Sequence, residues 1–146
     1  MFDDKRRLLD WGGHEARANK NQACRGIAAR LLRGYRPRHL VLEDALTPTS
    51  TRHVRIRRLL TLIAEDAACE TCVIVQIPKL RVRQRFCMYG AASKDDIASA
   101  ICSLYPELKS RLPKKRRPWQ SEHYSLAVFE AAALGVTFFS LSEQPR

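Results

Sequence analysis

The feature that most restricts the fold of this sequence is a short apolar run that ends in two acids. Residues 40–42 are Leu-Val-Leu, and Glu43 and Asp44 follow at once. An apolar run this short, closed by a turn-forming stretch at 45–48, predicts a buried strand over 39–44. Acids at the carboxyl end of such a strand lie where open α/β sheets bind ligands, which suggests a metal site. The alternative is that both carboxylates are solvated charges.

The rest of the chain alternates between helical and extended patterns. The first half of the chain is predicted to form a strand over 5–13, a helix over 20–32, the strand over 39–44 and a helix over 52–69, which is capped from the polar loop at 47–51. The second half is predicted to form a strand over 72–77, a helix after Pro78, a helix that is capped by Ser93 and runs to Leu104, and a helix that starts at Ser121. This order predicts an α/β fold with a mainly parallel sheet flanked by helices, as a single domain over 1–146.

The charge balance favours a polyanionic partner. Lys and Arg number 26 against 15 Asp and Glu, a formal net charge of +11. Such a surface binds nucleic acid through release of counterions, with an anionic membrane surface as the alternative. No apolar run approaches the roughly 18 residues of a spanning helix, and the first residues are not typical of a signal peptide. We therefore expect a cytoplasmic protein with no membrane partner. The cations expected to contact nucleic acid are Arg52, Arg55, Arg57, Arg58, Lys79, Arg81, Lys114, Lys115, Arg116 and Arg117.

The segment 105–120 is rich in proline and holds six cations between Lys109 and Arg117. This composition predicts a basic, exposed loop. Trp119 follows the cations, where it would either stack on an unpaired base or pack over the edge of the core.

The five cysteines include one Cys-x-x-Cys pair, Cys69 and Cys72. Without a second pair or a nearby histidine pair, a zinc site would lack two of its four ligands. Buried, reduced thiols are the preferred interpretation, with metal or redox chemistry as the alternative.

Val82-Arg83-Gln84 is followed by Gly90 and then by Lys94, eleven residues after Arg83. This segment resembles the pattern of Val-Lys-Gln, a Gly and a second Lys in RuvC-type Holliday junction resolvases, with the same interval between the two cations. Upstream, Glu43 stands where the family has a strand-end Glu. Downstream, Glu130 opens a small, apolar run that ends in Thr, as in the family's final helix.

The resemblance implies a ribonuclease H-like fold, here shortened at its N-terminus, and a structure-selective endonuclease that cuts branched DNA in recombination or repair. Two Mg²⁺ or Mn²⁺ ions would activate water and stabilise the leaving oxygen. Glu43 and Glu130 would hold the metals, and Arg83 and Lys94 would hold phosphate or offset charge in the transition state. Resolvases of this type pair up to make two symmetric cuts, so the resemblance also implies a homodimer.

The acid set departs from the family pattern. Ala127 replaces the family's second helix carboxylate. Glu122 is a substitute, yet eight residues of helix would separate it from Glu130 by about 12 Å. The family's first strand and its Asp have no clear equivalent, and Asp10 is an acid in that neighbourhood. The alternative function is therefore a truncated nucleic-acid-binding module of the same fold, catalytically impaired because its carboxylate set is incomplete.

Overall fold

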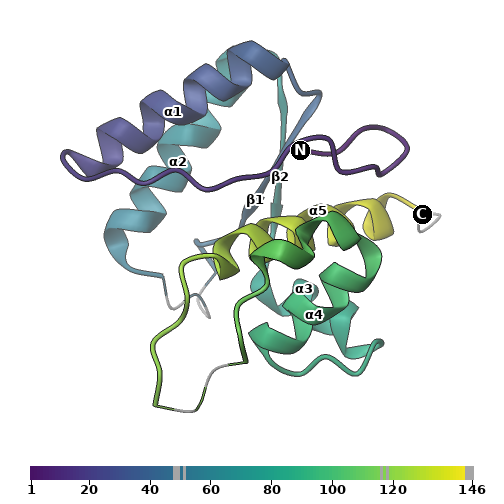
Figure 1. Ribbon diagram of the computed structural model, residues 1–146. Helices are drawn as coiled ribbons and strands as arrows, with labels where there is room; N and C mark the ends of the chain where they lie inside the picture. Colours follow the sequence, from purple (N-terminus) through teal and green to yellow (C-terminus); the bar gives the residue numbers. More distant parts are fainter. Residues whose placement is uncertain (48–49, 51, 116, 118, 144–146) are drawn as a thin grey trace. The chain divides into compact units, whose positions relative to one another are not determined.

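The computed structural model describes residues 1–47, 50, 52–115, 117 and 119–143 (Figure 1). The contacts between residues divide the chain into two compact units. We call residues 14–79 the sheet unit. Residues 1–13 and 80–146 form the helical unit.

Two helices and two strands form the sheet unit. In chain order they are α1 (Lys20–Tyr35), β1 (His39–Glu43), α2 (Val54–Cys69) and β2 (Val73–Ile77). The strands pair in parallel, with His39 opposite Val73 and Glu43 opposite Ile77. Parallel strands need a crossover connection, and α2 lies within it. The predicted parallel pairing is therefore confirmed, with both strands within a residue of their expected bounds.

The core of the sheet unit joins both helices to both strands. Leu32 of α1, Ala67 of α2 and Cys72 are buried together, and Leu40 and Ile74 pack against them from the strands. These are small or medium apolar side chains, so burial of their surface is the main favourable contribution to this contact.

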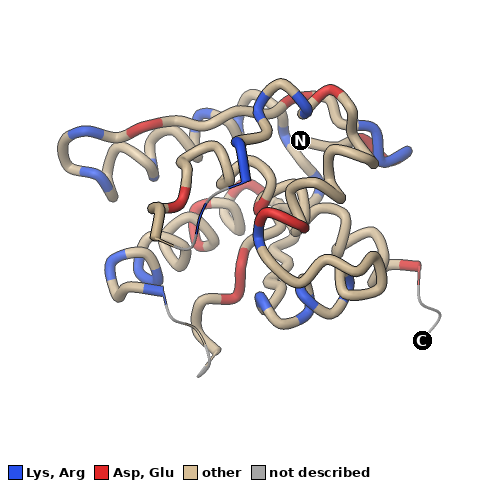
Figure 2. The backbone as a smooth tube through the Cα atoms, turned by 60° about the horizontal axis from the view of Figure 1, so that its bottom comes forward, with Lys and Arg blue, Asp and Glu red and all other residues tan. Residues whose placement is uncertain are grey.

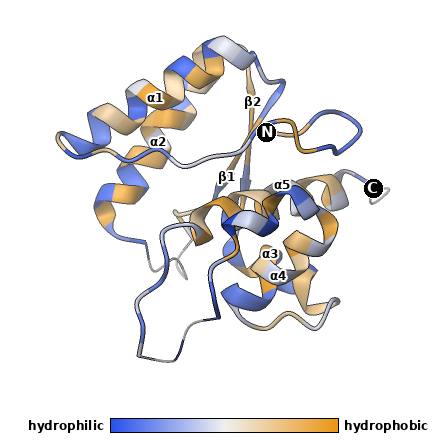
Figure 3. Cartoon of the chain, in the orientation of Figure 1, coloured by the Kyte–Doolittle hydropathy of each residue, from blue (hydrophilic) through white to orange (hydrophobic). Residues whose placement is uncertain are grey.

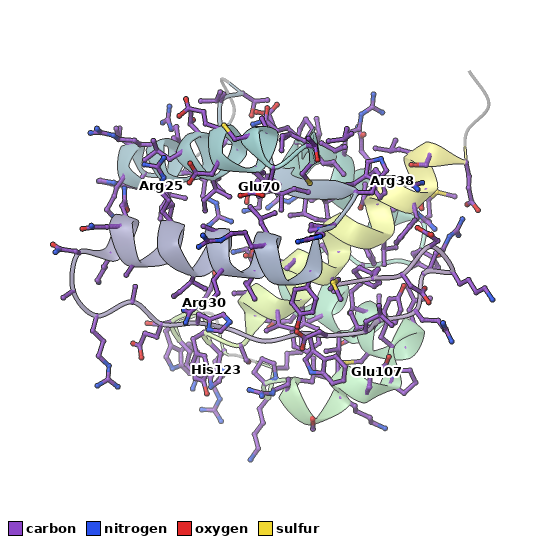
Figure 4. All side chains as sticks on the ribbon, turned by 90° about the horizontal axis from the view of Figure 1, so that it is seen from above. Arg25, Arg30, Arg38, Glu70, Glu107 and His123 are labelled. Carbon is purple, nitrogen blue, oxygen red and sulfur yellow. The ribbon has the colours of Figure 1, made fainter. Side chains whose placement is uncertain are left out.

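An ion pair adds a polar link between α1 and α2. The guanidinium of Arg25 donates to both carboxylate oxygens of Asp66, at 2.6 and 2.7 Å. Figure 4 shows Arg25 on the side of α1 that faces α2. The hydrogen bonds from Arg25 lower the pKa of Asp66, so the acid stays ionised well into the acidic range.

The turn that ends α2 holds a strained threonine. Thr71 lies in the left-handed region with φ of 59°. Its N–H donates to Ala68 O, and the N–H of Cys72 donates to Ala67 O, which is the pairing of a Schellman motif. Glycine usually occupies this position because a Cβ is disfavoured there, most of all in a β-branched residue.

Replacing Thr71 with Gly should therefore stabilise the protein. We expect the free energy of unfolding to rise by roughly 0.5–1 kcal/mol, because relief of backbone strain exceeds the added entropy of the unfolded chain. Urea denaturation would measure this. Thr71→Ala is the control, since it keeps the Cβ; the account is wrong if the Ala variant is as stable as the Gly variant.

Helices dominate the helical unit. They are α3 (Lys79–Cys87, whose first residue ends the sheet unit), α4 (Lys94–Leu104), the 3₁₀ helix η1 (Pro106–Arg111) and α5 (Leu126–Ser142). Ser93 caps α4, as predicted, and together with Asp96 it forms a capping box. α5 is apolar on nearly all faces (Figure 3), as expected of a helix that is buried. Its buried apolar side chains include Leu126, Phe129, Ala132, Ala133 and Val136.

The predicted strand over 5–13 is wrong. Within 1–13, the extended pairing is one isolated antiparallel bridge between Phe2 and Leu8. The carboxylate of Asp3 accepts hydrogen bonds from the N–H groups of Lys5 and Arg7, and this local bonding competes with an extended strand. The segment folds back on itself instead.

Phe2 packs on a glycine of α5. A Cβ placed at Gly135 would lie 2.4 Å from Phe2 Cε2, so the ring needs the bare backbone at that position. The ring also meets Tyr105 and Phe139 edge-on, with centroids 5.3 and 5.9 Å away. The N-terminal segment is thereby anchored to the helices of its own unit.

Gly135→Ala should have opposite effects with and without Phe2. In the wild type we expect a loss of about 1–3 kcal/mol in unfolding free energy, because the new methyl displaces the ring. In a Phe2→Ala background the same change should stabilise by up to about 1 kcal/mol, since Ala favours a helix more than Gly does. Denaturant unfolding of all four proteins gives the coupling. Equal effects in both backgrounds would show that the contact is unimportant.

Three other expectations need correction. α5 begins at Leu126 and not after Ser121, because residues 121–124 are all exposed and burial against the unit begins only at Ser125 and Leu126. The expected loop over 105–120 contains η1, whose Leu108 is buried. α2 is capped by His53 and not from the loop at 47–51, of which 48, 49 and 51 lie outside the described residues.

The cysteine prediction is only partly correct. All five thiols are free, but Cys69 and Cys87 are exposed and only Cys72 is buried. Burial raises the pKa of the Cys72 thiol, which makes it a poor nucleophile.

Among the described residues, no helix combines the length and the apolar character that crossing a bilayer requires.

Candidate functional site

Three of the predicted site residues meet at the first turn of α4. Lys94 is the first residue of that helix, and its ammonium lies 2.7 Å from a carboxylate oxygen of Glu122 and 2.8 Å from one of Glu130. Glu130 comes from α5, and Glu122 from the segment that precedes it. Only 22% of the Lys94 side chain is exposed. The cation therefore ties α4 to α5 inside the helical unit.

The charge state of this cluster follows from its contacts. Partial burial alone would lower the pKa of Lys94, but its hydrogen bonds to Glu122 and Glu130, with the charges of those acids, outweigh burial and raise the pKa. Lys94 is therefore an ammonium at neutral pH. One positive charge lies between two negative charges.

The separation expected between Glu122 and Glu130 was wrong. The 12 Å estimate assumed one continuous helix. Because α5 starts only at Leu126, residue 122 is not helical and lies just before a turn in which the N–H of Leu126 donates to His123 O. The chain can then bring Glu122 back to the same ammonium that Glu130 contacts.

Glu43 is held by an arginine of its own unit. It is the last residue of β1, as predicted, and the guanidinium of Arg52 donates to both of its carboxylate oxygens at 2.5–3.1 Å. Only 17% of the Glu43 side chain is exposed. Charge-assisted pairs of this bidentate form are among the stronger hydrogen bonds, so Glu43 is oriented by the protein itself.

The described carboxylates do not form a metal site. A Mg²⁺ centre needs several oxygens about 2.1 Å from one point, and two-metal centres share three or four acids. Among the described residues no three His, Cys, Asp or Glu side chains are grouped so that they could hold a metal. The carboxylates of Glu122 and Glu130 approach each other, and the ammonium of Lys94 lies between them. Within the helical unit, Glu122 and Glu130 as arranged therefore hold a lysine ammonium and not a shared ion.

Asp10 and Arg83 lie apart from this cluster. Asp10 belongs to the exposed N-terminal segment, where its backbone carbonyl accepts a hydrogen bond from the Met1 amino group. Arg83 is exposed on α3, and no ion pair joins it to any residue that the structure describes.

The predicted cations divide between the two units. Figure 2 shows Lys and Arg at the start of α2, beside the grey trace, and again in the loop before α5. Those of the sheet unit are Arg52, Arg55, Arg57, Arg58 and Lys79; those of the helical unit are Arg81, Lys114, Lys115 and Arg117. Arg116 lies outside the described residues.

Sequence reasoning missed two charge features of the sheet unit. The pairing of Arg52 with Glu43 joins residues only nine apart, and the opposite charges were the available signal. Arg30 and Arg33 were also overlooked. They are exposed and three apart, so they share a face of α1, and Figure 4 shows Arg30 on the side away from α2. The signal that could have identified them is their helical spacing on the polar side of an amphipathic helix.

Lys94→Met should destabilise the helical unit by about 1 kcal/mol, because two carboxylates lose their shared cation. The loss should be measurable at neutral pH, where Lys94 is an ammonium. In the wild type, the pKa of Lys94 is higher in the folded state than in the unfolded state. The stability that the ion pairs add is therefore retained up to about pH 10.5, and it is lost as the pH rises through the pKa of Lys94 in the folded protein.

Urea denaturation across this pH range measures the effect. Lys109→Met, on the exposed face of η1, is the matched control. Equal losses in the two variants would show that the ion pairs contribute nothing measurable.

No family model matches the sequence, and no curated protein matches it significantly. The fold, in contrast, is similar to a solved structure of RuvC from Thermus thermophilus. The TM-score is 0.59 with 12% sequence identity, over 92% of this chain and 76% of that chain. At this identity the likeness concerns the fold alone. This protein therefore has an α/β fold, with helices and a small parallel sheet, that is similar to the RuvC fold.

Proposed function

We propose that this chain is a nucleic-acid-binding module with a ribonuclease H-like fold, and that branched DNA is its preferred partner. The observation that carries the proposal is the ammonium of Lys94 between Glu122 and Glu130. An acid pair that serves as a structural counterion for lysine is not available to bind a catalytic metal. Such a protein keeps the fold and the basic surface of a nuclease without its metal chemistry.

The arrangement of charge supports the same conclusion. Glu43 and Asp66, acids of the sheet unit, each accept a bidentate arginine and so are neutralised locally. Other arginines are exposed, among them Arg55 and Arg58 on α2. With a net charge of +11, the chain has cations left over for phosphates, and their neutralisation would release counterions.

A metal-dependent endonuclease is the second candidate. It is favoured by the position of Glu43 at the carboxyl end of a parallel strand, in a fold that is similar to that of RuvC. This candidate includes the expectations of Mg²⁺ or Mn²⁺ and of a homodimer. It requires that a carboxylate now paired with Arg52 or Lys94 be released.

One experiment separates the two candidates. The protein is titrated against a labelled four-way junction and a linear duplex, and both DNAs are then incubated with Mg²⁺ or Mn²⁺. We expect tighter binding to the junction and no cleavage. Junction cleavage that is lost in Glu43→Gln would instead establish the endonuclease.

The same titration tests the basic surface. Arg58→Glu should weaken binding to all DNAs. The slope of log affinity against log salt concentration should also become shallower, by about the amount that one phosphate contact contributes. Arg17→Glu, the same charge change in an exposed segment outside α2, is the control. Absence of binding to either DNA would refute both candidates.

A further inference from the structure

We infer that Arg117, Trp119, His123 and Tyr124 form a stacking site for unpaired nucleobases, which we call the aromatic site. The inference rests on the proposed function and names the part of the nucleic acid that this surface would contact. All four residues belong to the segment between η1 and α5 in the helical unit. The chemistry recognised is the flat face of a base together with its phosphate, in DNA or RNA.

The exposure of the aromatic rings is the first observation. Trp119 is 75% exposed and Tyr124 is 83% exposed. Large aromatic side chains contribute most to folding when they are buried, so two that remain in solvent on one segment contribute little to the fold. The alternative in which Trp119 packs over the edge of the core does not agree with this exposure.

Trp119 is held beside a cation. The N–H of Gln120 donates to Arg117 O at 3.0 Å, and the Arg117 N–H donates to Gln120 Oε1 at 2.9 Å, which closes the turn around the tryptophan. The guanidinium of Arg117 lies over the ring, 5.6 Å from its centroid. An exposed indole with an adjacent guanidinium can stack on a base and contact the neighbouring phosphate.

Tyr124 is positioned by a second set of contacts. Its ring stacks on His123, with centroids 4.5 Å apart and planes at 30°. His123 is in turn fixed by a 2.7 Å hydrogen bond between Nδ1 and the hydroxyl of Ser125, a buried residue at the start of α5. The ring is thus preorganised at the end of a rigid helix, which lowers the entropic cost of stacking on it.

The surroundings favour nucleic acid over a protein partner. Lys114 and Lys115 are exposed in the same segment, and Gln120 and Ser121 are polar and exposed. Protein interfaces surround their aromatic anchors with apolar side chains and are depleted in lysine. Single-stranded nucleic acid is bound by aromatic rings interleaved with cations. A base-paired duplex hides its base faces, so the aromatic site would bind unpaired bases only.

The test uses the full chain and three oligonucleotides of equal length: oligo-dT, oligo-U and an abasic DNA with the same phosphates. In a Trp11→Phe background Trp119 is the single tryptophan, because the chain has two. We expect oligo-dT or oligo-U to quench its fluorescence and the abasic strand to leave it unchanged. A preference between the two base-bearing strands would identify DNA or RNA as the source, and either result supports the site.

Affinities measured by anisotropy of labelled strands complete the test. Trp119→Ala and Tyr124→Ala should each weaken single-strand binding at least about fivefold and leave duplex binding unchanged. Met88→Ala is the control, because Met88 is 81% exposed but has no aromatic face.

The outcomes separate this inference from the proposed function. Binding of the abasic strand as tight as that of oligo-dT, or single-strand affinity unchanged in both aromatic variants, would overturn the aromatic site while duplex binding still supported the module. Absence of binding to any nucleic acid would overturn both.

Discussion

The ammonium of Lys94 is the contact on which the arrangement of the candidate site depends. It joins the first turn of α4 to Glu130 in α5 and to Glu122 in the preceding segment. The ion pair with Lys94 fixes the position of Glu122. The next two residues in the chain are His123 and Tyr124, whose rings stack on each other. One partly buried cation therefore organises the acids that suggested a metal, and one of them, Glu122, directly precedes the stacked rings of His123 and Tyr124.

The two units use acids in the same way. In the sheet unit Glu43 accepts Arg52 and Asp66 accepts Arg25, so carboxylates act as internal counterions there too. A chain with this excess of positive charge needs such pairs, since unpaired arginines close together would repel one another. The acids that remain paired stabilise the fold, and the cations that remain exposed are available to a polyanion.

Local patterns predicted most of the elements, and prediction failed where side-chain hydrogen bonds or burial decided the structure. The helix that begins at Lys94 was predicted correctly because its cap, Ser93, lies next to the helix in the sequence. The strand expected over 5–13 was wrong because Asp3 hydrogen-bonds to neighbouring N–H groups, and periodicity does not show such bonds. The start of α5 was misplaced because a serine at 121 looks like a cap, whereas the burial that supports the helix begins at Leu126.

The sequence by itself determined the α/β class, the parallel strands with their crossover helix, the basic character and the residues Glu43, Lys94, Glu122 and Glu130 as candidates. These depend on composition, on periodicity and on spacing along the chain. Only the tertiary structure decided the role of those residues. Whether a carboxylate faces a metal, a lysine or water depends on which side chains from distant segments reach it, and residues 94, 122 and 130 meet only because α4 packs on α5 and the chain turns before Leu126.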